Sequence, residues 1–236
     1  MYDSLFELPF MMAGASGADS LIAGFSALGS SSISDALDRL GIAGQPVGIL
    51  PVGPDHGLCG RAFTVSYVPA QPGKGETVGD FIDDVPPGSV VVIDNGGRLD
   101  ATVWGDLMTT VAVRNGLAGT VIDGVCRDTP RARQMRYPIY SRGSFMRTGK
   151  DRVTLAAVDV PIALADHHVN PGDILFGDAD GLVIIPARDA EEALAVARQI
   201  SDAEEGIRTL LAEGLRLTDA RSRFGYHQLQ TKRQDR

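Results

Sequence analysis

The 236-residue chain has little cysteine and little histidine. It contains two cysteines and four histidines. Cys59 and Cys126 are far apart and belong to no CxxC pair, which argues against a disulfide scaffold and against a structural zinc site. We expect both to be small buried side chains in a reducing cytoplasm. His167 and His168 are adjacent, and neighbouring residues on an extended chain point in opposite directions, so the pair is poorly placed to share a metal ion.

Basic charge and long apolar runs are also scarce. The 22 basic residues are outnumbered by 30 acidic ones, which gives a formal net charge of −8. This balance argues against nucleic acid as a main partner, because phosphate neutralisation needs a basic face. No apolar run approaches the length of a membrane span, and the first basic residue is Arg39, so we expect neither a membrane segment nor a secretory signal. We therefore expect a cytoplasmic protein.

Several common catalytic and nucleotide-binding motifs are missing. GKGET lacks the spacing of a Walker phosphate loop, and the NGG after VVVID is better interpreted as a turn than as part of GxGxxG. No GxSxG nucleophile elbow is present. These absences leave no sequence support for a nucleotide-phosphate loop or a serine hydrolase.

The first half of the chain alternates predicted strands and helices. Strands are predicted at 61–68, at 90–94 and in the AGTVI run at 118–122, and another lies in YPIYSRG. SSISDALDRLGI has Ile33, Leu37 and Leu40 at helical spacing, with Ser and Asp as capping candidates and Gly41 as a stop. TVGDFIDDV, ATVWGDLMTTVAVRNG and TPRARQMR predict three further helices, the last with Pro130 near its first turn.

The second half is richer in predicted strands and ends in a helix. Residues 152–164 and 173–185 alternate as strands do, and PGDILFGDADGLVIIP predicts a strand–turn–strand unit. A closing helix starts at DAEEALAV, and the SDAE capping box predicts a possible break near Ser201. The last twenty residues are polar and basic, which suggests a mobile tail or an interface arm. The order of elements predicts an α/β sandwich with a β-rich layer. We divide the chain into an N-terminal extension (1–30), one domain (31–200), and a C-terminal helix with a polar tail (201–236).

Charged residues gather at two chain turns. Asp106 is predicted at the start of a helix, where free backbone N–H groups favour an anion. Arg127 and Asp128 follow the end of a buried strand, and ligands of α/β folds gather beyond the carboxyl ends of strands. The three residues form either a ligand site or a salt bridge that ties a strand end to a helix; these two interpretations have about even weight from composition alone.

The spacing of these residues resembles a known signature. Asp106, twenty intervening residues and Arg127-Asp128 give D-x20-R-D, which resembles the class II pyruvate aldolases of the 4-hydroxy-4-methyl-2-oxoglutarate/4-carboxy-4-hydroxy-2-oxoadipate aldolase family. The wider superfamily includes the regulator of ribonuclease activity A. The similarity spans roughly residues 31 to 200 and is carried by SDALDRLGI, WGDL, GLAGTVIDGVCRD, YPIYSRG and PGDILFGDADGLVIIP, in that order.

The resemblance implies a fold, an assembly and residue roles. The fold would be a swivelling β/β/α-type sandwich, assembled as a homotrimer or homohexamer with sites between subunits. Asp128 would ligate Mg²⁺, Mn²⁺ or another divalent metal, and Arg127 would hold the carboxylate and keto oxygen of a small 2-oxo acid substrate. Asp106 would orient a water on the metal. The substrate carboxylate would bind the backbone N–H groups of Gly105, Asp106, Leu107 and Met108.

The implied activity is metal-dependent retro-aldol cleavage of a 4-hydroxy-2-oxo (di)acid to pyruvate and a carbonyl product, with oxaloacetate decarboxylation as a side activity. The alternatives are a related lyase on another 2-oxo acid and a non-catalytic regulator that binds proteins. Ser34, Asp35 and Arg39 are weaker candidates for the site, and Arg142 for the distal carboxylate. The resemblance also implies an acidic residue from a neighbouring subunit, for which the candidates are Glu191, Glu192, Glu204, Glu205 and Glu213.

Overall fold

A large mixed sheet forms the centre of the molecule. The computed structural model describes residues 19–53, 56–71, 78–229 and 231. Eight strands form one sheet in the order β1-β5-β4-β3-β2-β9-β10, with β6 paired to β2. Their bounds are β1 (Leu50–Pro51), β2 (Leu58–Pro69), β3 (Val90–Thr102), β4 (Gly119–Cys126), β5 (Ile139–Ser144), β6 (Val153–Val158), β9 (Ile174–Gly177) and β10 (Leu182–Ile185).

The four inner strands β2, β3, β4 and β5 run parallel, and the remaining strands join them antiparallel. Every residue of β4 is buried, which explains why its sequence is a nearly continuous apolar run. Because the inner strands are parallel, their carboxyl ends lie at the same edge of the sheet, where ligands of such folds usually bind. The chain leaves β3 and β4 at this edge.

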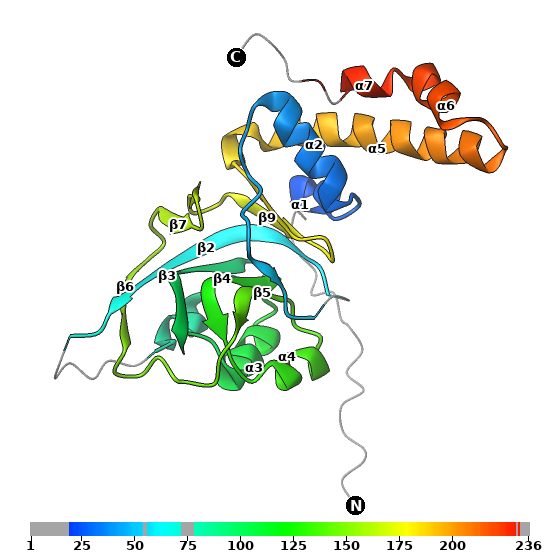
Figure 1. The fold of residues 1–236 in the computed structure, drawn as a ribbon. Helices are drawn as coiled ribbons and strands as arrows, with labels where there is room; N and C mark the ends of the chain where they lie inside the picture. The colour runs from blue at the N-terminus through cyan, green and yellow to red at the C-terminus, as the bar shows by residue number, and fades with distance from the viewer. Residues whose placement is uncertain (1–18, 54–55, 72–77, 230, 232–236) are drawn as a thin grey trace, which may run out of the picture.

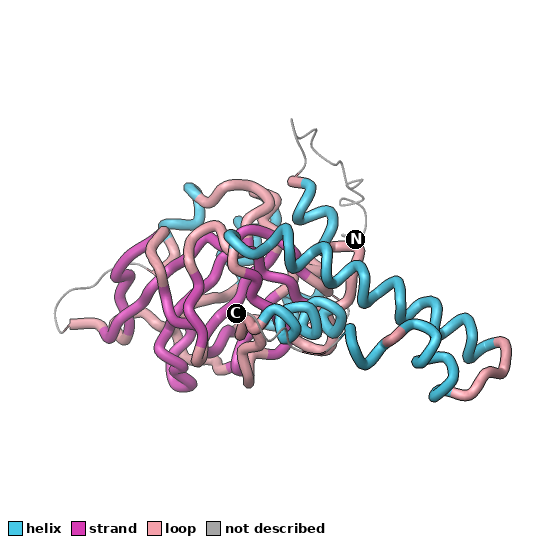
Figure 2. The backbone as a smooth tube through the Cα atoms, turned by 90° about the horizontal axis from the view of Figure 1, so that it is seen from above, coloured by secondary structure: helices cyan, strands magenta, loops and turns pink. Residues whose placement is uncertain are grey.

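Helices cover the sheet from two sides (Figure 1). α3 (Asp106–Arg114), α4 (Thr129–Gln134) and the 3-10 helix η1 (Asp80–Asp84) pack under the parallel strands. α1 (Ser20–Phe25), α2 (Ser30–Leu40) and α5 (Ala190–Ala212) pack on the other side against β9 and β10. The hairpin of β7 (Ile162–Leu164) and β8 (His167–Val169) contributes to a third apolar cluster. Viewed from above, the far half of α5 extends beyond the strands (Figure 2). This is the mixed α/β single domain that the sequence predicted.

The N-terminus of α2 is capped from a distant part of the chain. Its N-cap residue, Gly29, has no side chain for capping, and the expected Ser and Asp caps lie inside the helix. Instead, Ser30 N donates to Asp178 Oδ2 at 2.8 Å, and Ser30 Oγ donates to Asp178 Oδ1 at 2.7 Å. The DADG turn therefore ends one strand and also caps a helix. Gly41 does end α2, in a left-handed conformation with φ 70°.

Three expectations about local structure were wrong. The chain from Ala101 to Thr102 still belongs to β3, so α3 begins only at Asp106. α5 runs through Ser201 without a break, because Ile200 and Ile207 keep one face of the helix buried on both sides of that residue. Part of the expected polar tail is helical.

These tail helices are α6 (Leu217–Phe224) and α7 (Tyr226–Leu229). They fold back along α5 (Figure 1), where the Phe224 ring packs directly over Gly206 and Tyr226 donates a hydrogen bond to Glu204 at 2.7 Å. Residues 1–18, most of the N-terminal extension, lie outside the described residues, as do 230 and 232–236. In the described part of the chain, no helix is long and apolar enough to cross a membrane.

Candidate functional site

Two chain turns meet at the carboxyl edge of the parallel strands. After β3, Gly105 caps α3 in an extended conformation (φ −147°, ψ −164°). After β4, Asp128 caps α4 in a left-handed conformation (φ 56°), which is uncommon for a residue with a side chain. Arg127 N donates to Trp104 O at 3.0 Å and so joins the two turns. Residues 23 positions apart in sequence are thereby held next to each other.

The predicted charged residues come together at this junction. Asp128 Oδ2 lies 3.2 Å from Asp106 N and 3.3 Å from Arg127 Nε. The side chains of Arg127 and Asp128 are 39% and 40% exposed, so both are open to a ligand. A methyl group at Gly105 would lie 2.8 Å from Asp128 Oδ2 and 3.1 Å from Arg127 Nε. Glycine at position 105 is therefore what lets the carboxylate and the guanidinium approach the helix N-terminus.

The backbone donors of α3 are partly engaged by protein carboxylates. The backbone N–H of Asp106 donates to Asp128 Oδ2 at 3.2 Å, and the backbone N–H of Leu107 donates to Asp106 Oδ1 at 2.9 Å. The Leu107 side chain is 78% exposed, whereas Met108 packs against the apolar cluster with its sulfur close to Gly79. An anionic ligand that used these N–H groups would have to replace the two carboxylates.

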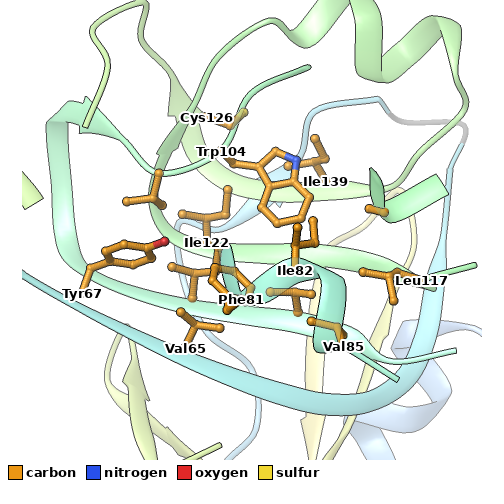
Figure 3. Packing of buried hydrophobic residues seen from close by; sticks show 14 of the residues in the cluster. Val65, Tyr67, Phe81, Ile82, Val85, Trp104, Leu117, Ile122, Cys126 and Ile139 are labelled. Carbon is orange, nitrogen blue, oxygen red and sulfur yellow. The ribbon is translucent and has the colours of Figure 1, made fainter. Parts of the chain in front are cut away.

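A buried polar network supports the junction from below, and sequence reasoning missed it. Trp104 is 1% exposed and stacks on Tyr137, with ring centroids 6.2 Å apart. Its indole N–H donates to Thr109 Oγ1 at 3.0 Å, and the hydroxyl of Thr102 lies 2.9 Å from Trp104 O. Figure 3 shows the indole at the top of the apolar cluster, between Cys126 and Ile139. Threonines are too common for their spacing alone to have revealed this network.

Cys126, directly before Arg127, is not part of the reactive set. It is fully buried, and burial raises the pKa of its thiol. Its sulfur lies 3.7 Å from Ser141 Oγ and from Gly143 O. A protonated, buried thiol is neither a nucleophile nor a metal ligand, so the residue acts as a small apolar side chain, as the sequence predicted.

The weaker candidates do not join the junction within one chain. Arg142 Nε donates to Asp123 Oδ1, and Asp123 also accepts the N–H of Ala165. Ser34 accepts a hydrogen bond from Gln45. The remaining candidates lie on α2 or at α5, across the sheet from α3 (Figure 1): Asp35, Arg39, Glu191, Glu192, Glu204, Glu205 and Glu213.

The donor atoms at the junction suit a hard divalent cation. No group of three or more His, Cys, Asp or Glu side chains that could hold a metal occurs among the described residues. Mg²⁺ and Mn²⁺ do not need such a group, because they are usually held by one or two carboxylates together with waters and substrate oxygens. The carboxylate of Asp128 is 40% exposed and lies beside the start of α3, where Asp106 supplies a second carboxylate, so it fits this mode of binding.

Comparison with known proteins places the chain in a family. A family model described as RraA-like, Aldolase/RraA, matches residues 30–184, more than half of the chain. The chain belongs to the RraA-like family. Its fold also matches a crystal structure of an uncharacterised protein from Pseudomonas syringae pv. tomato, with a TM-score of 0.81, 42% identity, and coverage of 86% of this chain and 98% of that one.

The relatives of this RraA-like chain carry names that point to different functions. Protein DlpA of Legionella pneumophila is 40% identical over 84% of this chain, but the chain spans only 33% of DlpA. A Halalkalibacterium halodurans protein, provisionally named 4-hydroxy-4-methyl-2-oxoglutarate aldolase, is 32% identical over 71% of this chain and 77% of its own length. Streptomyces coelicolor RraAS2, described as an unusual member of the RNase ES inhibitor RraA protein family, has a TM-score of 0.74 and 27% identity, with coverage of 83% of this chain and 99% of its own. Membership of the RraA-like family is therefore compatible with two functions for this chain, that of an aldolase and that of a regulator.

Proposed function

We propose that this protein is a divalent-metal-dependent carbon–carbon lyase. It cleaves a 4-hydroxy-2-oxo (di)acid to pyruvate and a carbonyl product, and it decarboxylates oxaloacetate as a side activity. The observation that carries the proposal is the junction itself, where Asp128 Oδ2 lies 3.3 Å from the guanidinium Nε of Arg127 and 3.2 Å from the backbone N of Asp106 at the start of α3. A protein that acts only through protein contacts has no need of this half-exposed set.

The residues fit the charges that develop in such a cleavage. The C3–C4 bond breaks, its electron pair moves to C3 as an enolate, and the 4-hydroxyl loses its proton as the new carbonyl forms. Arg127 remains charged at any working pH and offers a planar fork to the 2-oxo acid, so it both orients the substrate and stabilises the enolate oxygen. The exposed carboxylate of Asp106 takes the hydroxyl proton through a water, and protonation of C3 then yields pyruvate.

Asp128 is the residue that would hold Mg²⁺ or Mn²⁺. When bound, such an ion supplies Lewis acidity, which draws electron density from the keto group as the bond breaks. Decarboxylation of oxaloacetate produces the same enolate but removes no hydroxyl proton. It therefore depends on Arg127 and Asp128 and not on a base at Asp106.

We further propose a homotrimer or homohexamer in which a neighbouring subunit contributes an acidic residue to the site. Three large apolar residues are strongly exposed in the single chain, and Leu107 is one of them at the junction itself: Leu107 is 78%, Met146 76% and Val47 79% exposed. Burying such apolar surface against a neighbouring subunit is favourable, because it removes that surface from water. Light scattering coupled to size exclusion tests this directly, since a monomer near 25.0 kDa would reject the assembly.

The first experiment measures pyruvate release, coupled to lactate dehydrogenase and NADH. The substrates are 4-hydroxy-4-methyl-2-oxoglutarate and oxaloacetate, each assayed with Mg²⁺ and again with excess EDTA. We expect metal-dependent release from both. Release from oxaloacetate alone would reject the aldol cleavage and keep the enolate chemistry. Pyruvate release from neither substrate would favour a non-catalytic regulator that binds proteins; the Streptomyces relative belongs to a family of RNase inhibitors.

Two substitutions assign the roles within the junction. Asp128→Asn should abolish Mg²⁺-stimulated turnover while the protein stays folded. Arg127→Lys should lower kcat/KM roughly 10- to 150-fold, because a hydrogen bond to a charged group is typically worth about 1.5–3 kcal/mol. Arg114→Lys is the matched control, since Arg114 is an exposed arginine at the far end of α3 and makes a surface ion pair with Asp83 at 2.8 Å. Equal losses in the two arginine variants would mean that Arg127 has only a structural role.

A further inference from the structure

The two peptides that flank Gly105 are each held by a buried hydroxyl group. We infer that Thr102 and Thr109 are positioning residues, which fix these peptides and so aim the N-terminus of α3 at the Arg127–Asp128 pair. The inference rests on the proposed function for its catalytic consequence, but the positioning itself can be measured without turnover. Both threonines are almost fully buried, at 3% and 1% exposure.

Thr102 fixes the segment from the strand side. Its hydroxyl oxygen lies 2.9 Å from Trp104 O, 3.0 Å from Val125 O and 3.2 Å from Trp104 N. Trp104 O also accepts the backbone N–H of Arg127 at 3.0 Å. A single carbonyl group therefore couples the turn after β3 to the turn after β4. A shift of this carbonyl would move Arg127 relative to Asp106.

Thr109 fixes the segment from the helix side. Its hydroxyl accepts the indole N–H of Trp104 at 3.0 Å and donates to Gly105 O at 3.0 Å. The Trp104 ring is held in place by its stack on Tyr137. The Thr109 hydroxyl links this ring to the Gly105–Asp106 peptide, whose N–H donates to Asp128. The ring is buried within the apolar cluster (Figure 3), so it provides a rigid reference for the helix N-terminus.

The hydrogen bonds of the Thr102 and Thr109 hydroxyl groups position the catalytic residues and do more than fill space in the core. A valine has nearly the shape of a threonine and would fill either position without a polar atom to satisfy. Both hydroxyl groups instead bond to the main chain on either side of Gly105, whose missing side chain is what admits Asp128. Catalytic groups must be held within a fraction of an ångström, and a misplacement of about 1 Å can cost roughly 100-fold in rate.

The test compares Thr109→Val, Thr109→Ser and the control Thr110→Val. Thr110 is the next residue of α3 and makes the same type of bond, from Oγ1 to Asp106 O at 2.8 Å, but it is exposed, and the indole N–H of Trp104 is bonded to Thr109 instead. We expect Thr109→Val to lower kcat roughly 10-fold or more with less than about a twofold change in KM. Thr109→Ser, which restores the hydroxyl, should recover kcat to within about twofold, and Thr110→Val should match the wild type.

A second readout does not depend on activity. Trp104 is the only tryptophan of the chain, so its indole N–H gives a single NMR signal that needs no assignment. In Thr109→Val this signal and the amide signals of Asp106 and Leu107 should shift, whereas in Thr110→Val the indole signal should stay in place. If the wild type shows no lyase activity, the proposed function fails and these amide signals alone decide the positioning.

Three results would overturn the inference. The first is a folded Thr109→Val protein with wild-type kcat or unshifted Asp106 and Leu107 amides. The second is a Thr109→Ser protein as impaired as Thr109→Val. The third comes from Trp104→Phe, which breaks the same bond from its other end and serves if Thr109→Val does not fold: a wild-type kcat and unshifted amides in that variant would show that the link positions nothing.

Discussion

The Gly105→Ala substitution tests whether the close approach of Asp128 to the start of α3 is needed for activity, apart from any effect on the stability of the fold. Gly105 has φ −147° and ψ −164°, an extended conformation that alanine adopts without strain. The new methyl carbon would lie 2.8 Å from Asp128 Oδ2, where ordinary contact begins at 3.4 Å. The carboxylate must therefore retreat by the difference, about 0.6 Å, or the helix must move by the same amount. A displacement of that size is expected to lower kcat/KM by roughly tenfold or more.

Gly29→Ala is the matched control. Gly29 is also an N-cap glycine in an extended conformation (φ −100°, ψ 156°), and a methyl group there would have Ser31 Oγ as its nearest neighbour at 3.8 Å. Both substitutions should cost similar stability, about 1 kcal/mol or less, because alanine is a poorer N-cap than glycine. Only Gly105→Ala should weaken turnover and Mg²⁺ binding.

The assays are urea unfolding for stability, isothermal titration with Mg²⁺, and pyruvate release. Our reasoning would be refuted by a Gly105→Ala protein with wild-type turnover, which would show that the approach of Asp128 to the helix is not needed. It would also be refuted if Gly29→Ala lost as much activity as Gly105→Ala.

Three further predictions concern stability. Asp178→Ala should lower the free energy of unfolding by about 1–2 kcal/mol, because Ser30 at the start of α2 loses its cap, and the urea midpoint should fall with an unchanged slope. Gly206→Ala should displace the Phe224 ring and detach α6, so limited proteolysis should cut between α5 and α6 in this variant and spare the wild type. The free energy of unfolding should fall above pH 10, which is the ordinary pKa of a tyrosine hydroxyl. Burial raises the pKa of three tyrosines in the folded state, so above pH 10 these hydroxyls lose their protons in the unfolded chain before they do so in the folded one. Stability is then unchanged below pH 10 and falls as the pH rises further, and a urea midpoint that stayed constant from pH 8 to 11.5 would contradict this. These residues are Tyr67, Tyr137 and Tyr140.

The sequence predicted the elements that follow a simple period. The apolar run at 118–122 became the fully buried β4, and the spacing of Ile33, Leu37 and Leu40 became the buried face of α2. The carboxyl ends of parallel strands share one edge, and this geometry is why Asp106 could be predicted to meet Arg127 and Asp128. The D-x20-R-D resemblance and the family match agree on this region.

Features that depend on distant contacts could not be predicted in this way. α6 has few apolar residues, and it is held by the fit of one aromatic ring over a glycine of α5 that no local pattern reveals. The start of α3 was misplaced because Ala101 and Thr102 have no feature that separates a strand end from a helix start; their pairing with neighbouring strands decides it. The threonine network was missed for a similar reason, since a hydroxyl shows its partner only in three dimensions.

The cap of α2 by Asp178 also constrains the order in which the chain can fold. The two bonded residues are 148 positions apart, and β2 likewise pairs with β9. As the chain leaves the ribosome, α2 emerges long before the turn that caps it, so this part of the domain closes only after three quarters of the chain has been made. Such non-local closure predicts slow folding, and it predicts that fragments ending before residue 178 leave α2 uncapped, its apolar face exposed to other chains during synthesis.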